Sequence, residues 1–217
     1  MLTYNKNIEN NMYVKTLLAF LLATTTLLSH GQSMQKIWIS MPDSIAPYLN
    51  EQVRANMVEA FGTEEKTDNL ASGQSHIDTL TSDYLKAQIS EAATIEIKRL
   101  FSAAKSDSVI ACVSTFYGPE PESKLAFFDT AWQPITINAP IIKGAFQRPD
   151  TMSTELFEEI LITIDPEMLT YSLSPNNTLL KVTYSLPMLT TEEKAKAGLI
   201  IRPVEIDLND FLLKEVK

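Results

Sequence analysis

Side chains that commonly do chemistry are sparse in this sequence, and His76 is the first to weigh. It lies in SGQSHIDTL, with Ser75 directly before it and Asp78 two residues later. Serine, histidine and aspartate are the residue types of a nucleophilic triad. Triads assemble across a fold, however, and the chain has no G-x-S-x-G elbow. We therefore interpret His76 as a polar loop residue, and keep a hidden Ser–His pair around it as an alternative.

Carboxylates are the second candidate chemistry. Glu155, Glu158 and Glu159 follow each other at the i, i+3, i+4 spacing of one helix face. Hydrolysis of a glycosidic bond needs two carboxyl groups that converge across a cleft, rather than neighbours on one exposed turn. The spacing therefore favours a solvated face, and a carboxylate hydrolase stays an alternative.

Metal and nucleotide sites lack their usual residues. The chain after residue 31 has one histidine and one cysteine, too few for a closed zinc site, and no H-E-x-x-H motif. Asp207, Asn209 and Asp210 have calcium-binding oxygens but lack the glycine and distal glutamate of an EF-hand. Only six glycines occur in all, and none form a phosphate-binding loop. We predict no metal and no cofactor.

The single cysteine, Cys112, lies inside an apolar stretch. One cysteine cannot form an intrachain disulfide. No basic neighbour is evident to lower the pKa of its thiol, so we interpret Cys112 as a small buried hydrophobic residue.

The N-terminus has the pattern of a secretory signal peptide. Lys15 precedes the apolar run TLLAFLLATTTLL (residues 16–28), and small residues follow up to Gly31. The run is short for a membrane span, although an uncleaved anchor is the alternative. We predict a signal peptide over residues 1–31, with Met1 or Met12 as the start, and a mature chain that begins at Gln32. Since Gln32 is not a cysteine, a lipoprotein is not expected. The mature protein would be exported to the periplasm or the cell exterior.

Length and charge bound the remaining chain. The sequence has 217 residues, 45% of them hydrophobic, and a formal net charge of −9. These values suit one globular domain over residues 32–217, or two fused halves over 32–148 and 149–217. The acidic balance and the lack of a basic run argue against nucleic acid as a partner. Contact with a membrane is expected only through the signal peptide.

The stretch 108–130, SVIACVSTFYGPEPESKLAFFDT, is the segment around which the fold is organised. It predicts two strands joined by a polar turn. Both faces of the first strand are apolar, with Val109, Ala111 and Val113 on one face and Ile110 and Cys112 on the other. A strand of this kind is usually central and covered on both sides.

Further elements flank this pair. In the first half, the sequence predicts a short strand or extended lead-in over 36–40, a helix from Asp43 or Ser44 to Phe61, a loop over 63–75, strands over 84–89 and 94–101, and a short extended piece over 135–137. In the second half it predicts a helix over 150–164, a hairpin over 169–174 and 178–186, a capped helix or loop over 190–197, and a strand over 199–208.

These elements predict an α+β fold, with antiparallel sheets packed by two main amphipathic helices. The spacing of Leu85, Ser90 and Thr94 recurs at Leu169, Ser174 and Thr178, which suggests two fused αβ repeats. An amphipathic helix must bury its apolar stripe, and a sheet face is the expected partner.

A surface for recognition is the remaining candidate site. Tyr117, Glu120, Glu122 and Trp132 cluster in sequence around the central hairpin and its exit. Aromatic side chains beside acidic loop residues can form the rim of a binding surface. The alternative is that Trp132 caps the core.

Three segments together resemble a known family. MPDSIAPYLNEQVR, LTSDYLKAQIS and LAFFDTAWQPI are similar to an uncharacterised family of exported Bacteroidales proteins, catalogued as a domain of unknown function. The resemblance covers the chain from about Gln32 to the C-terminus. It implies export and fold integrity, and it brings no activity, ligand or catalytic residue.

The sequence as a whole favours a non-enzymatic module of the cell envelope that binds a protein partner. The alternatives are an envelope hydrolase that uses carboxylates or His76, and a carrier of a small apolar ligand between sheet and helices. The hydrolase requires a concave pocket with His76 or two converging acids, and the carrier requires an unfilled apolar cavity.

Overall fold

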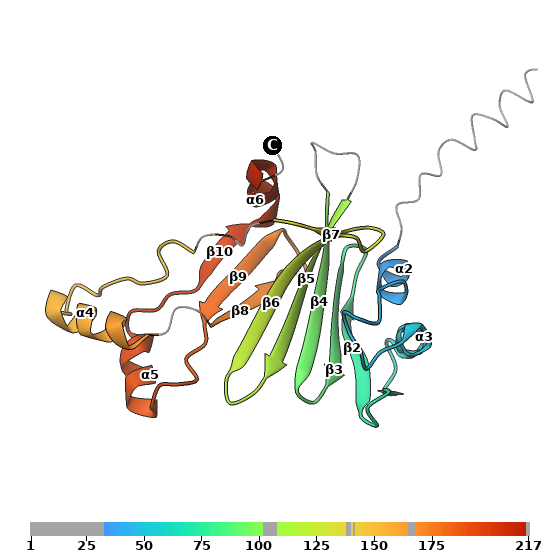
Figure 1. Ribbon diagram of the computed structural model, residues 1–217, viewed down its shortest axis with the longest axis horizontal. Coiled ribbons are helices and arrows are strands. Elements are labelled where there is room, and N and C mark those ends of the chain that lie inside the picture. Colours follow the sequence, from blue (N-terminus) through green and yellow to red (C-terminus); the bar gives the residue numbers. More distant parts are fainter. Residues whose placement is uncertain (1–32, 102–107, 138–139, 141, 165–167, 216–217) are drawn as a thin grey trace, which may run out of the picture. The chain divides into compact units, whose positions relative to one another are not determined.

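Seven antiparallel strands form one meandering sheet in the computed structural model, which describes residues 33–101, 108–137, 140, 142–164 and 168–215. Each strand pairs with the next along the chain, as Figure 1 shows. The strands are β1 (Thr67–Asp68), β2 (Gln74–Leu80), β3 (Tyr84–Ser90), β4 (Ala93–Phe101), β5 (Ser108–Tyr117), β6 (Pro121–Asp129) and β7 (Pro134–Ile135).

The expectation for β5 is confirmed, because both of its faces are covered. Ile110 and Cys112 belong to a core cluster that includes the N-terminal helices. Val109 and Val113 belong to a second cluster, shared with the C-terminal part of the chain. Alternation along a strand sends neighbouring side chains to opposite faces, so one apolar strand supplies two cores.

The prediction of a strand over 36–40 is wrong, since these residues lie in the helix α2 (Met34–Ile39) and the turn after it. Met34, Ile37, Trp38 and Met41 are at most 2% exposed. Their spacing of i, i+3, i+4 and i+7 is helical, so burial of this stripe overrides the β-propensity of the two isoleucines.

The next helix, α3 (Glu51–Ala60), begins later than predicted. The Asn50 side chain caps it by accepting from the Val53 N–H at 2.9 Å. Residues 43–49 form turns instead of helix, since Pro47 has no N–H to donate and Asn50 is a strong N-cap. Leu49, Val53 and Met57 still form the expected buried stripe.

Strand β2 corrects the interpretation of His76 as a loop residue. The predicted loop over 63–75 contains β1 and the start of β2. In β2, Ser75 and Ile77 are buried, and they alternate with His76 and Asp78. The segment is therefore a half-buried strand. Because the buried position 75 is a serine, the sequence does not show the alternation of apolar and polar residues that is typical of such a strand.

A second, smaller sheet has the order β10-β9-β8. It consists of β8 (Leu169–Leu173), β9 (Leu179–Tyr184) and β10 (Val204–Asp207). The predicted hairpin is confirmed as β8 and β9. The last predicted strand is shorter than expected, because Pro203 precedes it and helix α6 (Leu208–Glu215) begins directly after Asp207. Ile206 of β10 packs against the second core cluster, which contains the α6 residues Leu208 and Leu212.

Two helices, α4 (Thr154–Thr163) and α5 (Thr191–Gly198), contact each other. Ser153 caps α4, and Thr190 with Glu193 forms a capping box at α5. Ile160 of α4 and Ala197 of α5 share a third core cluster. The expectation that both main helices bury their stripes against a sheet therefore holds for α3, whereas α4 buries its stripe mainly beside α5.

The α+β fold class with antiparallel sheets is confirmed. Residues Met34–Lys217 group as one compact unit. Among the described residues, no helix has both the length and the apolar character needed to cross a membrane. The predicted signal peptide over residues 1–31 lies outside the described part of the chain.

Candidate functional site

Three of the four predicted surface residues lie in or beside the turn between β5 and β6. Tyr117 ends β5 and is 44% exposed, with its hydroxyl 3.2 Å from the Thr94 Oγ1. Glu120 lies in the turn and pairs with Lys194 of α5 at 2.5 Å, which ties α5 to this turn. Glu122 follows on β6 and is exposed. The register pairs Tyr117 with Pro121 and Phe116 with Glu122, so Tyr117 and Glu122 point to opposite faces of the hairpin. The role of these residues in binding stays a prediction.

Trp132 does not belong to that surface, which corrects the predicted cluster. It follows β6 at the opposite end from Tyr117, and a nine-residue strand spans about 27 Å. Trp132 is 4% exposed, and its indole N–H donates to the Ile37 carbonyl at 3.0 Å. The alternative reading, in which Trp132 caps the core, describes its place in the structure.

Strand β6 has a free backbone edge. It pairs with β5 along its whole length, but with β7 only at Phe127 and Phe128. The stretch 121–126 therefore pairs with no strand on its outer side among the described residues, although β8 packs close to β6. A groove of about 520 Å³ runs beside this edge. We call it the β6 groove, and its lining comprises residues 122–128 of β6, residues 134–137 and Tyr171 of β8.

Two buried charges join the sheets. The alternation of Ile95 and Ile97 with Glu96 and Lys98 predicts a half-exposed strand, and the burial of both charged residues of β4 corrects this prediction. Glu96 and Lys98 are 5% and 2% exposed. Glu96 Oε2 accepts from the Leu173 N–H of β8 at 2.6 Å, and Lys98 donates to the Pro175 carbonyl at 3.2 Å. Lys86 and Asp83 supply the opposite charges, at 3.3 and 2.9 Å. Polar residues that were expected to face solvent thus hold the small sheet against the large one.

Arg54 is a third buried charge. It lies opposite the apolar stripe of the first helix, on a face that the sequence predicts to be solvated. It is 2% exposed and donates to the Ile39 carbonyl and to the Asp43 carboxylate, at 3.1 and 2.9 Å. Asp43 was expected to cap the first helix; instead its carboxylate neutralises Arg54.

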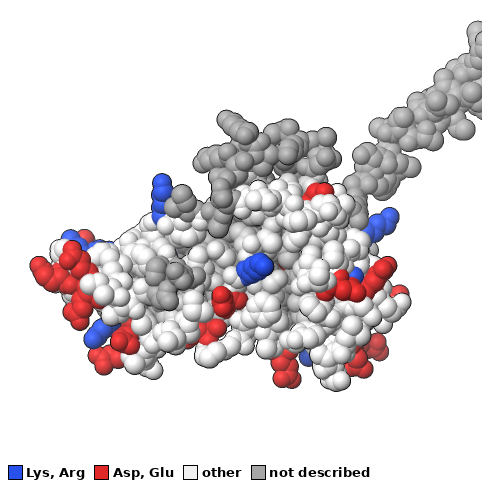
Figure 2. Space-filling view, viewed as in Figure 1, with Lys and Arg blue, Asp and Glu red and all other residues white. Residues whose placement is uncertain are grey.

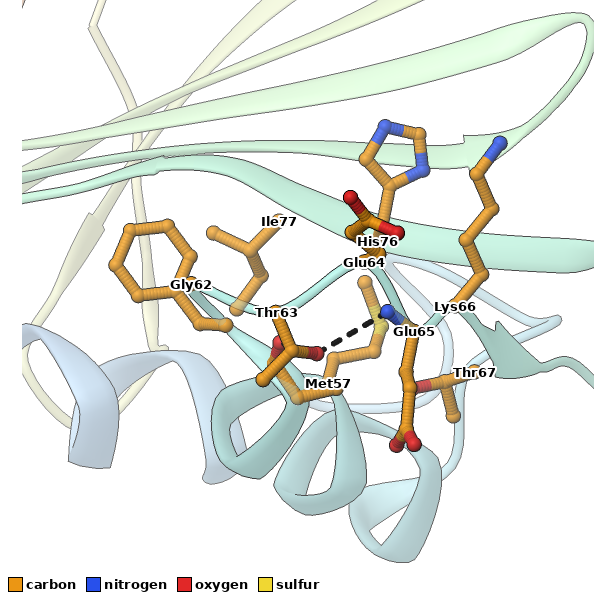
Figure 3. Close-up of a pocket in the computed structure, with 11 residues that line it drawn as sticks. Met57, Gly62, Thr63, Glu64, Glu65, Lys66, Thr67, His76 and Ile77 are labelled. Carbon is orange, nitrogen blue, oxygen red and sulfur yellow. Dashed lines mark hydrogen bonds between the residues drawn. The ribbon is translucent and has the colours of Figure 1, made fainter.

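His76 lines a small pocket of about 110 Å³ between the end of α3 and β2, drawn in Figure 3. Its Nε2 lies 2.9 Å from Asp78 Oδ1, and its Nδ1 is buried without a partner among the described residues. Glu64 and Glu65 also line the pocket, but Figure 3 shows their carboxylates pointing in opposite directions. The pocket therefore contains His76 without a converging pair of acids.

Ser75 is not a nucleophile for His76. The two residues are neighbours on β2, so their side chains point to opposite faces. Ser75 is fully buried, and its hydroxyl donates to the Ile89 carbonyl at 2.5 Å. His76 and Asp78 thus share one face of β2, whereas Ser75 lies on the other face, and the three side chains do not form a triad.

The remaining candidate groups do not assemble into a site in the described part of the chain. Glu155, Glu158 and Glu159 are all exposed on α4. Hydrogen bonds from its own backbone N–H and from Ser153 lower the pKa of the Glu155 carboxyl. Asp207 accepts from the Thr178 hydroxyl and from the Asn209 N–H, both at 2.9 Å. No three His, Cys, Asp or Glu side chains in the described ranges lie together as a metal would require.

Charge is unevenly distributed over the face shown in Figure 2. Acidic side chains gather over α4 and α5 and near α3, and further acidic groups lie beside the basic group near the middle of this face.

The two antiparallel sheets and the grooves beside them define an α+β protein whose described pockets contain no assembled catalytic set. The chain belongs to a family described as "Protein of unknown function (DUF3256)", whose model matches residues 26–206. This match bears out the resemblance to a family of unknown function.

A solved structure has a similar fold. It is described as "Structure of a domain of an uncharacterized protein from Porphyromonas gingivalis W83", and the two chains are 21% identical. The similarity covers 79% of this chain and 90% of that chain, with a TM-score of 0.62. No curated protein matches the sequence.

Proposed function

We propose that the protein is an exported module of the cell envelope that binds an extended segment of a partner protein along the β6 groove. The observation that carries this proposal is the free edge of residues 121–126 beside a groove of about 520 Å³. An unpaired edge presents a row of backbone donors and acceptors, to which an extended chain can add as a further strand.

The chemistry of the groove suggests what the partner segment looks like. On one side lie the partly buried side chains of Leu125, Ile135 and Tyr171, which would pack against alternate apolar residues. Glu122 and Lys124 are exposed on β6. Charges on an edge strand oppose pairing between copies of the same chain, so they favour a partner with a complementary charge pattern.

The alternatives have less support. A hydrolase around His76 has a pocket, but Ser75 is turned away and a cavity of about 110 Å³ is smaller than the usual ligand pocket. A carrier of an apolar ligand needs an enclosed apolar cavity. The pockets of about 330 and 520 Å³ instead open to solvent and include charged side chains.

Photocrosslinking in the native host tests the β6 groove. A photoreactive amino acid at Lys124 should give a discrete adduct with one protein. The same group at Lys143, which is exposed and does not line the groove, should give none. Equal adducts at both positions, or none at Lys124, would contradict the proposal.

A charge reversal provides a second test. Lys124→Glu should lower recovery of the crosslinked or co-purified partner severalfold, whereas Lys143→Glu should leave it unchanged. Both lysines are exposed, so neither change should alter the thermal midpoint of unfolding by more than a degree or two. Unchanged recovery with Lys124→Glu would place the contact elsewhere.

A further inference from the structure

A second pocket lies where the polar face of the small sheet meets the large sheet. The register pairs Ser172 with Lys181 and Thr170 with Thr183. These four side chains are on the face opposite to Leu173 and Leu180, which enter the core. We call the opening beside them the corner pocket; its volume is about 330 Å³.

The large sheet lines the other side of the corner pocket with polar groups. Thr115 and Ser123 face each other across β5 and β6, with their hydroxyls 2.8 Å apart. Tyr117, Lys86 and Glu96 also line this side. The lining thus has hydroxyls that both donate and accept, and an aromatic ring that offers an apolar face.

The corner pocket is lined by two cationic side chains, Lys86 and Lys181, and by one anionic side chain, Glu96. Glu96 is neutralised by Lys86 and also accepts from the Leu173 N–H. Lys181 forms no ion pair with any residue in the described ranges, although Glu205 is its register partner on β10. The Lys181 side chain is exposed, so its ammonium group is accessible to a ligand that enters the pocket from solvent.

We propose that the corner pocket binds a small sugar that carries an anionic group. Lys181 would hold the anion, because a charge-assisted hydrogen bond is stronger than a neutral one. The hydroxyls of Thr115, Ser123 and Thr183 would exchange hydrogen bonds with the sugar hydroxyls, and Tyr117 would cover one side of the ring. A volume of about 330 Å³ lies at the lower end of the usual range for ligand pockets, which suits a ligand of this size.

This inference goes beyond the proposed function and does not depend on it. The β6 groove and the corner pocket share Ser123 and Tyr171, but Lys181 lines only the corner pocket and Lys124 lines only the groove. Failure of partner capture and failure of sugar binding are therefore separate results.

Calorimetric titration of the protein purified from its own host tests the proposal. The probes are D-glucuronate, D-glucose 6-phosphate and neutral D-glucose, which separate a carboxylate ligand from a phosphate ligand. At least one anionic sugar should bind at least about tenfold more tightly than glucose. Lys181→Gln should weaken that binding by about tenfold, the effect of losing one hydrogen bond to a charged group.

Two controls keep the result specific. Lys143→Gln removes the same charge outside the pocket and should leave the affinity unchanged. Thr183→Val removes a lining hydroxyl and should weaken binding without removing charge. The proposal is overturned if neither anionic sugar binds, if glucose binds equally well, or if Lys181→Gln and Lys143→Gln have the same effect.

Discussion

Two requirements compete at Trp132. Its backbone is left-handed, with a φ of 61°, which costs a bulky residue about 1–2 kcal/mol. Its buried indole packs against Phe128 at 5.2 Å between ring centroids and donates to the Ile37 carbonyl. Burial of a tryptophan contributes more than this backbone cost, so the structure keeps the left-handed residue.

Substitutions at Trp132 separate these two terms. Trp132→Ala should lower the free energy of unfolding by about 3–5 kcal/mol, measured by chemical denaturation. The loss for Trp132→Gly should be smaller than the loss for Trp132→Ala by about 1 kcal/mol, because glycine adopts a positive φ without strain. If Trp132→Ala lowers the free energy of unfolding by less than about 1 kcal/mol, Trp132 is not a core residue and becomes a candidate for the binding surface again.

Cys112 is predicted to be inert toward thiol reagents in the native protein. It is 2% exposed, and burial raises the pKa of its thiol to about 12. At pH 8 the folded protein should therefore resist alkylation, whereas the denatured protein should react. Rapid labelling of the native protein, followed by mass spectrometry, would contradict this.

The same thiol makes stability fall in alkali. Between about pH 9 and 12 the unfolded chain loses the Cys112 proton and the folded chain keeps it, so the free energy of unfolding falls by about 1.4 kcal/mol per pH unit. Below pH 9 this contribution is constant. Cys112→Ala should make the free energy of unfolding depend less steeply on pH over this window. The pH dependence that remains would include a contribution from Tyr84, whose pKa is also raised by burial.

At the scale of elements, the small sheet depends on Glu96. Glu96→Ala would leave the Leu173 N–H and the Lys86 ammonium without their partner and should cost about 3–5 kcal/mol. Hydrogen exchange over residues 169–184 should rise most, because the hairpin β8–β9 loses its attachment to β4. Glu205→Ala, an exposed glutamate on β10, is the matched control and should have little effect. Equal exchange in both variants would contradict the role of Glu96.

Elements with an unambiguous period were predictable from the sequence. The hairpin of β8 and β9 follows from alternation, and β5 follows from a continuous apolar run that ends at turn residues. In α2, by contrast, Ile37 and Ile39 fit a strand, while Met34, Ile37, Trp38 and Met41 fit a helix. Only the burial of the helical set decides between them.

The candidate site was predictable only in part, for a related reason. Tyr117, Glu120 and Glu122 lie together because one turn connects them in sequence. The corner pocket joins Lys86 to Lys181, which come from different sheets, so no local pattern indicates their approach. The available signal was the polar end of β5, where Thr115 and Tyr117 continue an apolar stripe.

For the whole molecule, the proposed binding of an envelope partner requires export, whereas the proposal for the corner pocket does not depend on where the protein resides. We expect residues 1–31 to be removed on export, because a basic residue, an apolar run and small residues follow in the order of a signal peptide. The purified protein should then begin at Gln32 by intact mass and N-terminal sequencing. Leu21→Arg with Leu22→Arg interrupts the apolar run, and this variant should stay uncleaved in the cytoplasmic fraction. If the unaltered protein also stays there at full length, the search for its partner moves to the cytoplasm, while the calorimetric test of the corner pocket stands unchanged.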